Sequence, residues 1–370
     1  MIEHDPYRIA DPDGLETPAM VVFEELVDRN LAALCEQVGG AANLMMHVKT
    51  HKSEAIVRKQ LAAGVAGFKC ATLKELEMVL DAGAPEAVLA YPLVQSIKTR
   101  RFAGITADHP EQRVYATVSA PIHVSRLAEA GRARERKLRV MVDVDAGMRR
   151  TGVAPKGVPD LYAAIHGEEW LEAAGLHIYD GHEHFQDPSG REAAAMAHVR
   201  DLQALKQKLE GAGLPVERVV GGGSYSYEYY ARTEGFHGSP GTVTYWDING
   251  VLGKPGQPFR WAALVLCQVV DRYPDQLTIT TDLGNKAVAA DPALERRAWL
   301  LGHKDARLLL QNEEHAVFQL PEGTLPEIGD YLLAVPGHVC PTAIRFPGCY
   351  VIDGEGAVVD YYPHTARDRL

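Results

Sequence analysis

The sequence predicts an α/β protein, a closed (β/α)8 barrel of the TIM type with a C-terminal antiparallel β domain. Three observations lead to this prediction. Short β-rich runs alternate with helical stretches from Thr17 to about residue 250, which is typical of parallel βαβ units. We count eight such runs, the number that closes a barrel, and a doubly wound open sheet is the alternative. Beyond Gly250, β-rich runs continue without helices between them.

The predicted barrel strands are short and rich in β-branched, aromatic or other apolar residues. They cover residues 19–23, 43–48, 67–71, 87–92, 113–119, 138–145, 171–179 and 216–223. Helices are predicted at residues 53–64, 73–83 and 191–211, and each ends at a glycine, as helices commonly do.

The C-terminal part is predicted to be antiparallel. Its β-rich runs cover residues 260–273, 276–284, 330–339 and 349–362. Asp353-Gly354 in the last run is a typical hairpin turn. We therefore expect a barrel at residues 18–248 and a β domain at residues 249–370, which residues 1–17 join as an extra strand.

The composition is that of an ordinary globular chain, with 24% charged and 46% hydrophobic residues. A net charge of −11 argues against nucleic acid or an anionic membrane surface as partners. No apolar run approaches the roughly 20 residues of a membrane span, and the acidic N-terminus lacks the apolar core of a signal peptide. The five cysteines have no framework spacing, so a reducing cytoplasm is expected.

A lysine stands where a barrel enzyme carries its chemistry. Catalytic residues of such barrels lie at the C-terminal ends of the strands. The run 43–48 is followed by Lys49, within a stretch (47–52) that also contains two histidines and a second lysine. A partly desolvated lysine has a lowered amine pKa and can form an imine. From the residues alone, a surface lysine that begins a loop remains the alternative.

The last predicted barrel strand ends in three consecutive glycines, Gly221 to Gly223, followed by Ser224. Glycines expose backbone N–H groups without a Cβ in the way and so can cradle a phosphate. The segment 239–242 could add further donors, and barrels often bind phosphate in the loops after strands 7 and 8. A flexible turn is the alternative.

Two neighbouring strands end in polar and aromatic side chains. The run 171–179 ends at Tyr179, and residues 180–184 then supply two histidines and two acids, which suits ring stacking and proton transfer. The run 138–145 is followed by Arg149 and Arg150, so at least one guanidinium is expected at the same mouth. A solvated polar loop and a surface ion pair are the respective alternatives.

In the β domain, His338 and Cys340 are two residues apart in a predicted strand. Such residues face the same way, so an imidazole and a thiolate can meet one ion. Two ligands are too few for a structural zinc site, but they leave positions for water and substrate, as a catalytic metal requires. A buried cysteine beside a hydrogen-bonded histidine is the alternative.

Together these residues make the chain resemble the fold-type III pyridoxal-phosphate enzymes, the alanine racemase superfamily, and especially its D-threonine aldolase and D-serine dehydratase branch. The resemblance spans nearly the whole chain. It rests on the lysine motif, present as residues 47–52, and on the metal motif, present as residues 338–342. It implies pyridoxal phosphate as cofactor, Lys49 as its covalent lysine with His47 beside it, and a divalent metal on His338 and Cys340.

The resemblance implies further roles for residues at the barrel mouth. Arg150 would approach the phenolic oxygen of the cofactor, and Tyr179 would stack on its pyridine ring. Ser239 would face the pyridine nitrogen as an uncharged partner. His182 and His184 are both candidates for the base that takes the hydroxyl proton of the substrate. The phosphate would be bound by Gly222, Gly223, Ser224, Gly241 and Thr242.

The activity implied is that of a lyase on D-β-hydroxy-α-amino acids. D-threonine aldolase activity is preferred. D-serine or D-3-hydroxyaspartate dehydratase activity is the first alternative. The dehydratases have cysteine at the second metal position, as this chain does in Cys340, whereas the aldolases tend to have aspartate there. An amino-acid racemase is the second alternative, although it has no use for the metal pair. Zinc is the favoured metal, with manganese and cobalt as alternatives. A homodimer is expected, since enzymes of this kind build their sites between two subunits.

Overall fold

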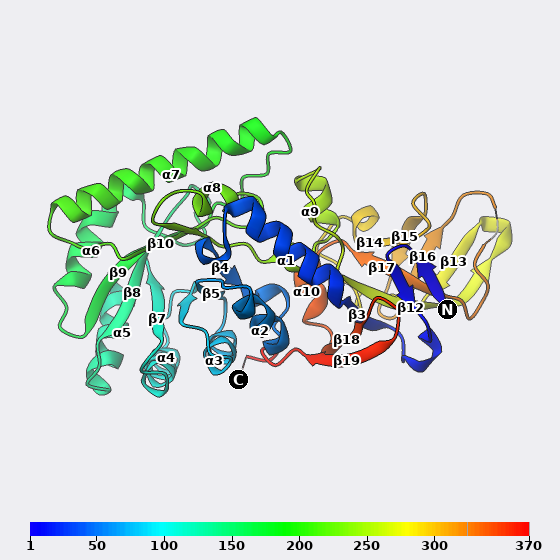
Figure 1. Ribbon diagram of the computed structural model, residues 1–370, viewed down its shortest axis with the longest axis horizontal. Helices are drawn as coiled ribbons and strands as arrows, with labels where there is room; N and C mark the ends of the chain where they lie inside the picture. Colours follow the sequence, from blue (N-terminus) through cyan, green and yellow to red (C-terminus); the bar gives the residue numbers. More distant parts are fainter. Residues whose placement is uncertain (324, 370) are drawn as a thin grey trace. The chain divides into compact units, whose positions relative to one another are not determined.

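Eight consecutive strands form a parallel sheet in the computed structural model, which describes residues 1–323 and 325–369. Each strand pairs with its neighbour in chain order (Figure 1). The strands are β4 (Met45–His47), β5 (Gly67–Cys70), β6 (Glu86–Leu89), β7 (Arg113–Val118), β8 (Leu138–Val144), β9 (Leu171–Ile178), β10 (Arg218–Gly221) and β11 (Phe236–Gly238).

The sheet closes on itself between its first and last strands. Leu44 forms a parallel bridge with Gly238, and the Ser239 hydroxyl donates a hydrogen bond to the Met45 carbonyl at 2.7 Å. The interior is packed with side chains rather than open, as in other barrels of this size. The buried interior cluster comprises Met45, Val88, Tyr115, Met141, Ala174 and Val220. The predicted (β/α)8 barrel is therefore confirmed.

Helices follow the barrel strands along the chain. They are α2 (Glu54–Ala62), α3 (Leu73–Asp81), α4 (Ser96–Asp108), α5 (Pro121–Ala133), α6 (Val158–His166), α7 (Pro188–Gly211) and α8 (Tyr227–Ala231). Side-chain caps fix two of their N-termini: Thr72 accepts from the Glu75 N–H in α3, and Asp187 accepts from the Gly190 N–H in α7. The three helices predicted from glycine-terminated patterns are confirmed, with ends shifted by a few residues.

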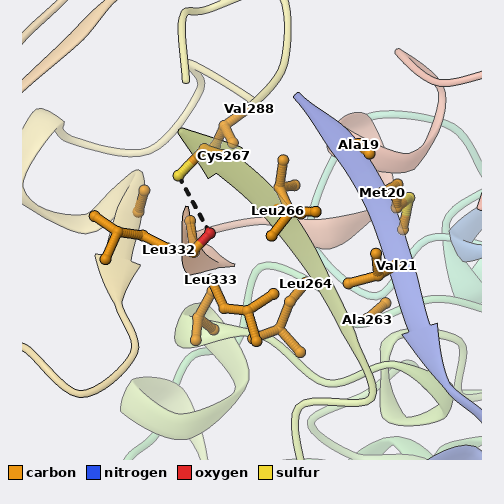
Figure 2. Close-up of a cluster of buried hydrophobic side chains, with 14 of the residues drawn as sticks. Ala19, Met20, Val21, Ala263, Leu264, Leu266, Cys267, Val288, Leu332 and Leu333 are labelled. Atoms are coloured by element: carbon orange, nitrogen blue, oxygen red, sulfur yellow. Dashed lines mark hydrogen bonds between the residues drawn. The ribbon is translucent and has the colours of Figure 1, made fainter. Parts of the chain in front are cut away.

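The prediction that residues 19–23 form the first barrel strand is wrong. β3 (Ala19–Phe23) pairs antiparallel with β12 (Ala263–Tyr273) and parallel with β18 (Gly348–Ile352), so it belongs to the second sheet. Figure 2 shows Ala19, Met20 and Val21 beside the apolar side chains of β12. All five residues of β3 are buried, and such a run looks the same in a barrel and in the centre of another sheet.

The eighth barrel strand is instead β11, which the sequence did not predict because it has only three residues and no apolar pattern. Lys49 therefore follows the first barrel strand, not the second. The glycine triplet follows the seventh strand, and Ser239 and Gly241 follow the eighth.

The second sheet is mainly antiparallel, as predicted, with β3 and β18 as a parallel pair. Its strand order is β15-β16-β13-β12-β3-β18-β19, and β17 pairs with both β12 and β14. The remaining bounds are β13 (Thr278–Thr281), β14 (Ala298–Leu300), β15 (Arg307–Gln311), β16 (Ala316–Gln319), β17 (Tyr331–Pro336) and β19 (Val358–Pro363). The predicted hairpin turn at Asp353-Gly354 joins β18 to β19.

The N-terminal segment forms its own hairpin rather than one extra strand. β1 (Ile2–His4) pairs antiparallel with β2 (Tyr7–Ile9) in a separate two-stranded sheet. Ile2, Tyr7 and Ile9 are buried in the same apolar core as β3 and β12. Burial of these side chains, not sheet extension, ties the segment down.

Two compact units result, and their bounds differ from the predicted domains. The β unit consists of Met1–Ala33, Thr50–Ile56 and Thr242–Arg367, and the barrel unit of Leu34–Lys49, Val57–Gly241 and the last residues of the chain. Residues 18–33 lie with the β unit because β3 pairs there, and α1 (Glu24–Val38) passes from one unit to the other. Among the described helices, none combines the length and apolarity needed to cross a membrane.

Candidate active site

A cavity lies at the C-terminal ends of the barrel strands, where the sequence predicted the chemistry. Its lining includes His47, Lys49, Lys69, Asp143, Arg150 and Tyr179, all from the barrel unit. Lys49 is half-buried in a 3-10 turn directly after β4, and its backbone N–H donates to His47 Nδ1 at 3.4 Å. The lysine motif thus brings His47 and Lys49 into the same cavity.

Three cationic groups surround the ring of Tyr179. Lys49 Nζ lies 5.7 Å, Lys69 Nζ 5.5 Å and the Arg150 guanidinium carbon 4.7 Å from the ring centroid. Cations within about 6 Å of an aromatic face are attracted by its quadrupole. The cavity wall is therefore cationic and aromatic, a combination that suits an anionic, planar ligand.

Glycine is required where the triplet approaches this ring. A Cβ on Gly223 would lie 2.8 Å from Tyr179 Cε2, closer than real Cβ contacts allow, and Gly222 has a φ of +74°. Asp180 is buried and accepts two hydrogen bonds from the segment after this turn. Ser226 Oγ donates to its carboxylate at 2.7 Å and the Tyr230 hydroxyl at 3.0 Å. Buried Asp180 therefore orders the segment that follows the glycine turn.

Asp143 and His177 form a buried pair that the sequence reading missed. His177 Nδ1 and Asp143 Oδ1 are 2.7 Å apart, and the Thr151 hydroxyl donates to Asp143 Oδ2 at 2.8 Å. Burial lowers the pKa of His177, whereas for Asp143 the hydrogen bond and charge of His177 outweigh burial and lower its pKa. We infer a neutral imidazole whose Nδ1–H donates to the carboxylate.

His177 Nε2 is buried and has no hydrogen-bond partner among the described residues, although the ring lines the cavity. An orphaned buried acceptor of this kind indicates a ligand that supplies a donor. The sequence carried a signal: His177 precedes Tyr179 by two residues, so both face the same side of the strand.

The two candidate histidines after β9 are both exposed. His182 Nε2 lies 3.6 Å from the position that a Cβ on Gly147 would take, beside the loop that carries Arg150. His184 instead packs edge-on against Tyr225, with ring centroids 5.0 Å apart. Of the two, His182 is the one that lies beside a loop lining the cavity.

The predicted polar residues of the last strand serve in part to close the barrel. The hydroxyl of Ser239 donates to the Met45 carbonyl, and its N–H donates to the Gly221 carbonyl at 3.0 Å. Its hydroxyl proton is thus committed to the fold, although the oxygen can still accept. Gly241 is buried and Ser224 is half-buried, while Thr242 Oγ1 lies 3.7 Å from Cys340 Sγ in the β unit.

These features of the barrel unit fit pyridoxal phosphate. The cofactor needs an amine for its aldehyde, cations for its anionic groups and a glycine turn that its phosphate can approach. Lys49, Arg150 with Lys69, and Gly222 with Gly223 supply them, and His177, whose Nε2 has no partner among the described residues, lines the same cavity.

The predicted metal pair lies in the β unit, but not on a strand. β17 ends at Pro336, and His338 is the N-cap of the short helix α10 (Val339–Ala343), which contains Cys340. The strand geometry predicted for the pair is therefore wrong, because Gly337 leaves the sheet before His338. The two side chains nevertheless interact, since Cys340 contributes to raising the pKa of His338.

Carboxylates and hydroxyls surround the pair. His338 Nδ1 is 2.6 Å from Asp291 Oδ2, and Cys340 Sγ lies 3.2 Å from Thr50 Oγ1. Burial alone would lower the pKa of His338, but the hydrogen bond and charge of Cys340, with Asp291 and Asp247, raise it to about 9. The proton belongs to the metal-free protein, because a bound cation displaces protons from its ligands.

The pair fits an open metal site. An imidazole whose Nδ1–H is held by a carboxylate is oriented for coordination through Nε2, and metal-binding histidines usually have such a partner. Among the described residues, no group of three or more His, Cys, Asp or Glu side chains is disposed to hold an ion. Two protein ligands would leave positions for water and substrate.

Asp291 gives a testable prediction. Replacing Asp291 with Asn removes the charge that orients His338, so we expect metal affinity to fall by about 10- to 100-fold while the fold is retained. Isothermal titration with zinc measures the change. Replacing Glu295, an acid in the nearby 3-10 helix, with Gln is the control. Unchanged affinity in the Asp291 variant would show that the carboxylate does not support the site.

Comparisons with known proteins cover both units. Residues 25–248 match the family "Alanine racemase, N-terminal domain", and residues 262–352 match "Putative serine dehydratase domain". The chain is 25% identical to the 3-hydroxy-D-aspartate aldolase of Paracoccus denitrificans (strain Pd 1222), over 97% of this chain and 94% of that protein. It is also 25% identical to the D-threo-3-hydroxyaspartate dehydratase of Delftia sp. (strain HT23), over 93% and 96%.

A solved structure is similar over the whole chain. The D-threonine aldolase from Filomicrobium marinum superimposes with a TM-score of 0.88 at 27% identity, covering 98% of this chain and 99% of that one. Aldolases and a dehydratase thus resemble the chain to nearly the same degree.

Proposed function

We propose that this chain, which belongs to the alanine racemase N-terminal-domain family of fold-type III pyridoxal-phosphate enzymes, is a metal-dependent lyase of D-β-hydroxy-α-amino acids. Relatives that match nearly the whole chain are named aldolases and dehydratases, so it is a pyridoxal-phosphate-dependent enzyme of the lyase group. Aldol cleavage to glycine and an aldehyde, as in D-threonine aldolase, is the reaction that we favour. β-Elimination to a 2-oxo acid and ammonia is the alternative.

The observation that carries this proposal is the His338–Cys340 pair with its Asp291 partner. A racemase breaks only the Cα–H bond and has no use for a metal beside the substrate. Both hydroxyls near Cys340 are also contiguous in sequence with predicted cofactor residues, since Thr50 follows Lys49 and Thr242 follows Gly241. This contiguity supports a metal and a cofactor that serve one substrate.

When bound, pyridoxal phosphate supplies an electron sink for a bond broken at Cα, and a divalent metal supplies Lewis acidity at the β-hydroxyl. The protein's own residues do the rest. Lys49 would hold the cofactor covalently, Arg150 would bind its phenolic oxygen, and Tyr179 would support its ring. His338 and Cys340 would hold the metal, for which zinc is favoured over manganese and cobalt because imidazole and thiolate are borderline-soft ligands.

Two proton transfers distinguish the reactions. In aldol cleavage, a base removes the β-hydroxyl proton while the Cα–Cβ bond breaks, and His182, beside Gly147, is our candidate. In β-elimination, the freed Lys49 amine takes the Cα proton while hydroxide leaves. The dehydratase alternative is supported by the Delftia match. It is also supported by Cys340, because the dehydratases of the branch that the chain resembles have cysteine at this metal-ligand position.

Product analysis tests the proposal. The purified enzyme is incubated with D-threonine, D-serine and D-3-hydroxyaspartate, each with and without added zinc or manganese. Glycine plus an aldehyde establishes aldol cleavage, and a 2-oxo acid plus ammonia establishes elimination. Formation of the L-enantiomer with neither product set would overturn the lyase assignment in favour of racemisation.

We predict that the active enzyme is a homodimer. Tyr91, Val94 and Ile97 are exposed apolar residues on the loop after β6 and the start of α4, at the same strand ends as the cofactor cavity. Apolar side chains clustered on a surface often mark an interface. Light scattering should give twice the 40.4 kDa chain mass, and Ile97→Asp should shift it toward the monomer with loss of activity. An active monomer at working concentration would contradict the prediction.

A further inference from the structure

Lys69 is a buried lysine of the cavity wall that the sequence pattern did not single out and that has no assigned part in the proposed reaction. It is the third residue of β5, and its residue exposure is 2%. Its ammonium group donates to the Gly222 carbonyl at 3.3 Å and lies 5.5 Å from the Tyr179 ring centroid. Lysines are almost never fully buried unless a partner compensates the charge. One carbonyl and an aromatic face leave the compensation incomplete.

The charges around Lys69 come from the ends of three other barrel strands, β4, β8 and β9. Lys49 after β4 and Arg150 after β8 repel its positive charge, while Asp143 on β8 and Asp180 after β9 attract it. Both acids are already hydrogen-bonded, Asp143 to His177 and Thr151, and Asp180 to Ser226 and Tyr230.

Burial, followed by the charge of Lys49, lowers the pKa of Lys69 to about 7. Its proton is therefore held weakly in the protein alone. A dianionic phosphate and a phenolate entering the cavity would restore the ammonium form, because opposite charges nearby favour the charged state of an amine.

We propose that Lys69 is an electrostatic positioning residue for the cofactor: its ammonium group retains the anionic cofactor and weakens the proton affinity of the linkage between Lys49 and that cofactor. The inference rests on the proposed function, since it assumes pyridoxal phosphate on Lys49. The physical reason is simple Coulomb repulsion. A fixed positive charge in a poorly solvated cavity disfavours a second positive charge on the Lys49 nitrogen.

Replacing Lys69 with Gln isolates the charge. Glutamine is shorter by one atom but keeps an N–H donor, so the position stays polar while the positive charge is lost. Lys69→Arg retains the charge. Lys74→Gln is the matched control, because Lys74 is a partly exposed lysine of α3 that pairs with Glu77. Circular dichroism establishes folding for all three variants.

The first measurement is a spectrophotometric pH titration of the cofactor-loaded proteins. In Lys69→Gln, the midpoint of the visible band should rise by at least about one pH unit, a tenfold gain in proton affinity, because removal of a positive charge stabilises the protonated linkage. The second is cofactor affinity by fluorescence quenching, which should fall about tenfold or more. Lys69→Arg and Lys74→Gln should titrate and bind as the parent protein does.

The measurements distinguish a failure of the proposed function from a failure of the role assigned to Lys69. A parent protein without a visible band that borohydride bleaches would remove pyridoxal phosphate and the proposed function with it. A parent with that band, and a Lys69→Gln variant with unchanged midpoint and affinity, would overturn the role of Lys69 alone. If Lys69→Gln does not fold, Lys69→Met takes its place in both measurements. Failure of both neutral variants to fold, with Lys69→Arg folded and shifted by a unit or more, would also overturn it.

Discussion

Lys49→Ala is expected to abolish both the visible cofactor band and all turnover. Lys49 is the amine at the end of the first barrel strand, half-buried in the cavity and within 6 Å of the Tyr179 ring centroid, at 5.7 Å. Without it, the aldehyde of the cofactor loses its covalent anchor, and the site loses the amine that exchanges with the substrate. Absorbance spectra before and after borohydride, together with product assays, measure both losses.

The controls for this prediction are the other lysines nearby. Lys52 is buried in the β unit, and its carbonyl accepts from the Ala366 N–H. Lys52→Ala should keep the band, as should Lys74→Ala on α3. A Lys49→Ala protein with a reducible band would move the covalent role to Lys69 or Lys52, and peptide mapping after borohydride would show which.

Chelation is expected to remove the activity while it leaves the visible band and the fold unchanged. The metal pair lies in the β unit, and the candidate cofactor residues other than Thr242 lie in the barrel unit, so we expect the cofactor to be held without the metal. Zinc should restore the rate. His338→Ala should cost nearly all activity, and activity should fall on the acid side because both ligands must lose protons before they bind metal.

Cys340→Asp tests the chemistry of the same ligand position. A carboxylate is a harder ligand than a thiolate, so the variant should remain active and shift its preference from zinc toward manganese. Rates with each metal after dialysis against chelator measure the shift. If the chelated parent enzyme works as fast as the metal-loaded one, the metal is incidental. The lyase mechanism must then give way to racemisation or transamination.

The sequence predicted the barrel because its signals are local. Alternation of strands and helices, glycine-terminated helices and the turn at Asp353-Gly354 depend on residues close in the chain. β3 and β11 were missed because membership of a sheet depends on distant partners: β3 meets β12 and β18, and β11 meets Leu44. A buried apolar run carries no record of which sheet buries it.

In the candidate site, too, local features could be predicted and contacts between distant residues could not. The lysine and metal motifs could be found because each is a short contiguous stretch. Asp291 lies 47 residues before His338 and so left no local signal. His177 could have been found from its two-residue spacing to Tyr179. Lys69 could not, since a single lysine in a short strand does not reveal that its ammonium group donates to the Gly222 carbonyl, in the turn after a distant strand.

The place of β3 in the second sheet sets the order in which this protein can be completed during its synthesis. β3 leaves the ribosome among the first residues, yet its partner Ala263 follows Phe23 by about 240 residues, which takes roughly 10 to 50 seconds of translation. Until then, a fully apolar strand has no sheet to join and is exposed to pairing with other chains. A fragment that stops near residue 248 would keep that hazard permanently. Because β3 lies between β12 and β18, we expect folding to depend on chaperones and truncated genes to give inclusion bodies.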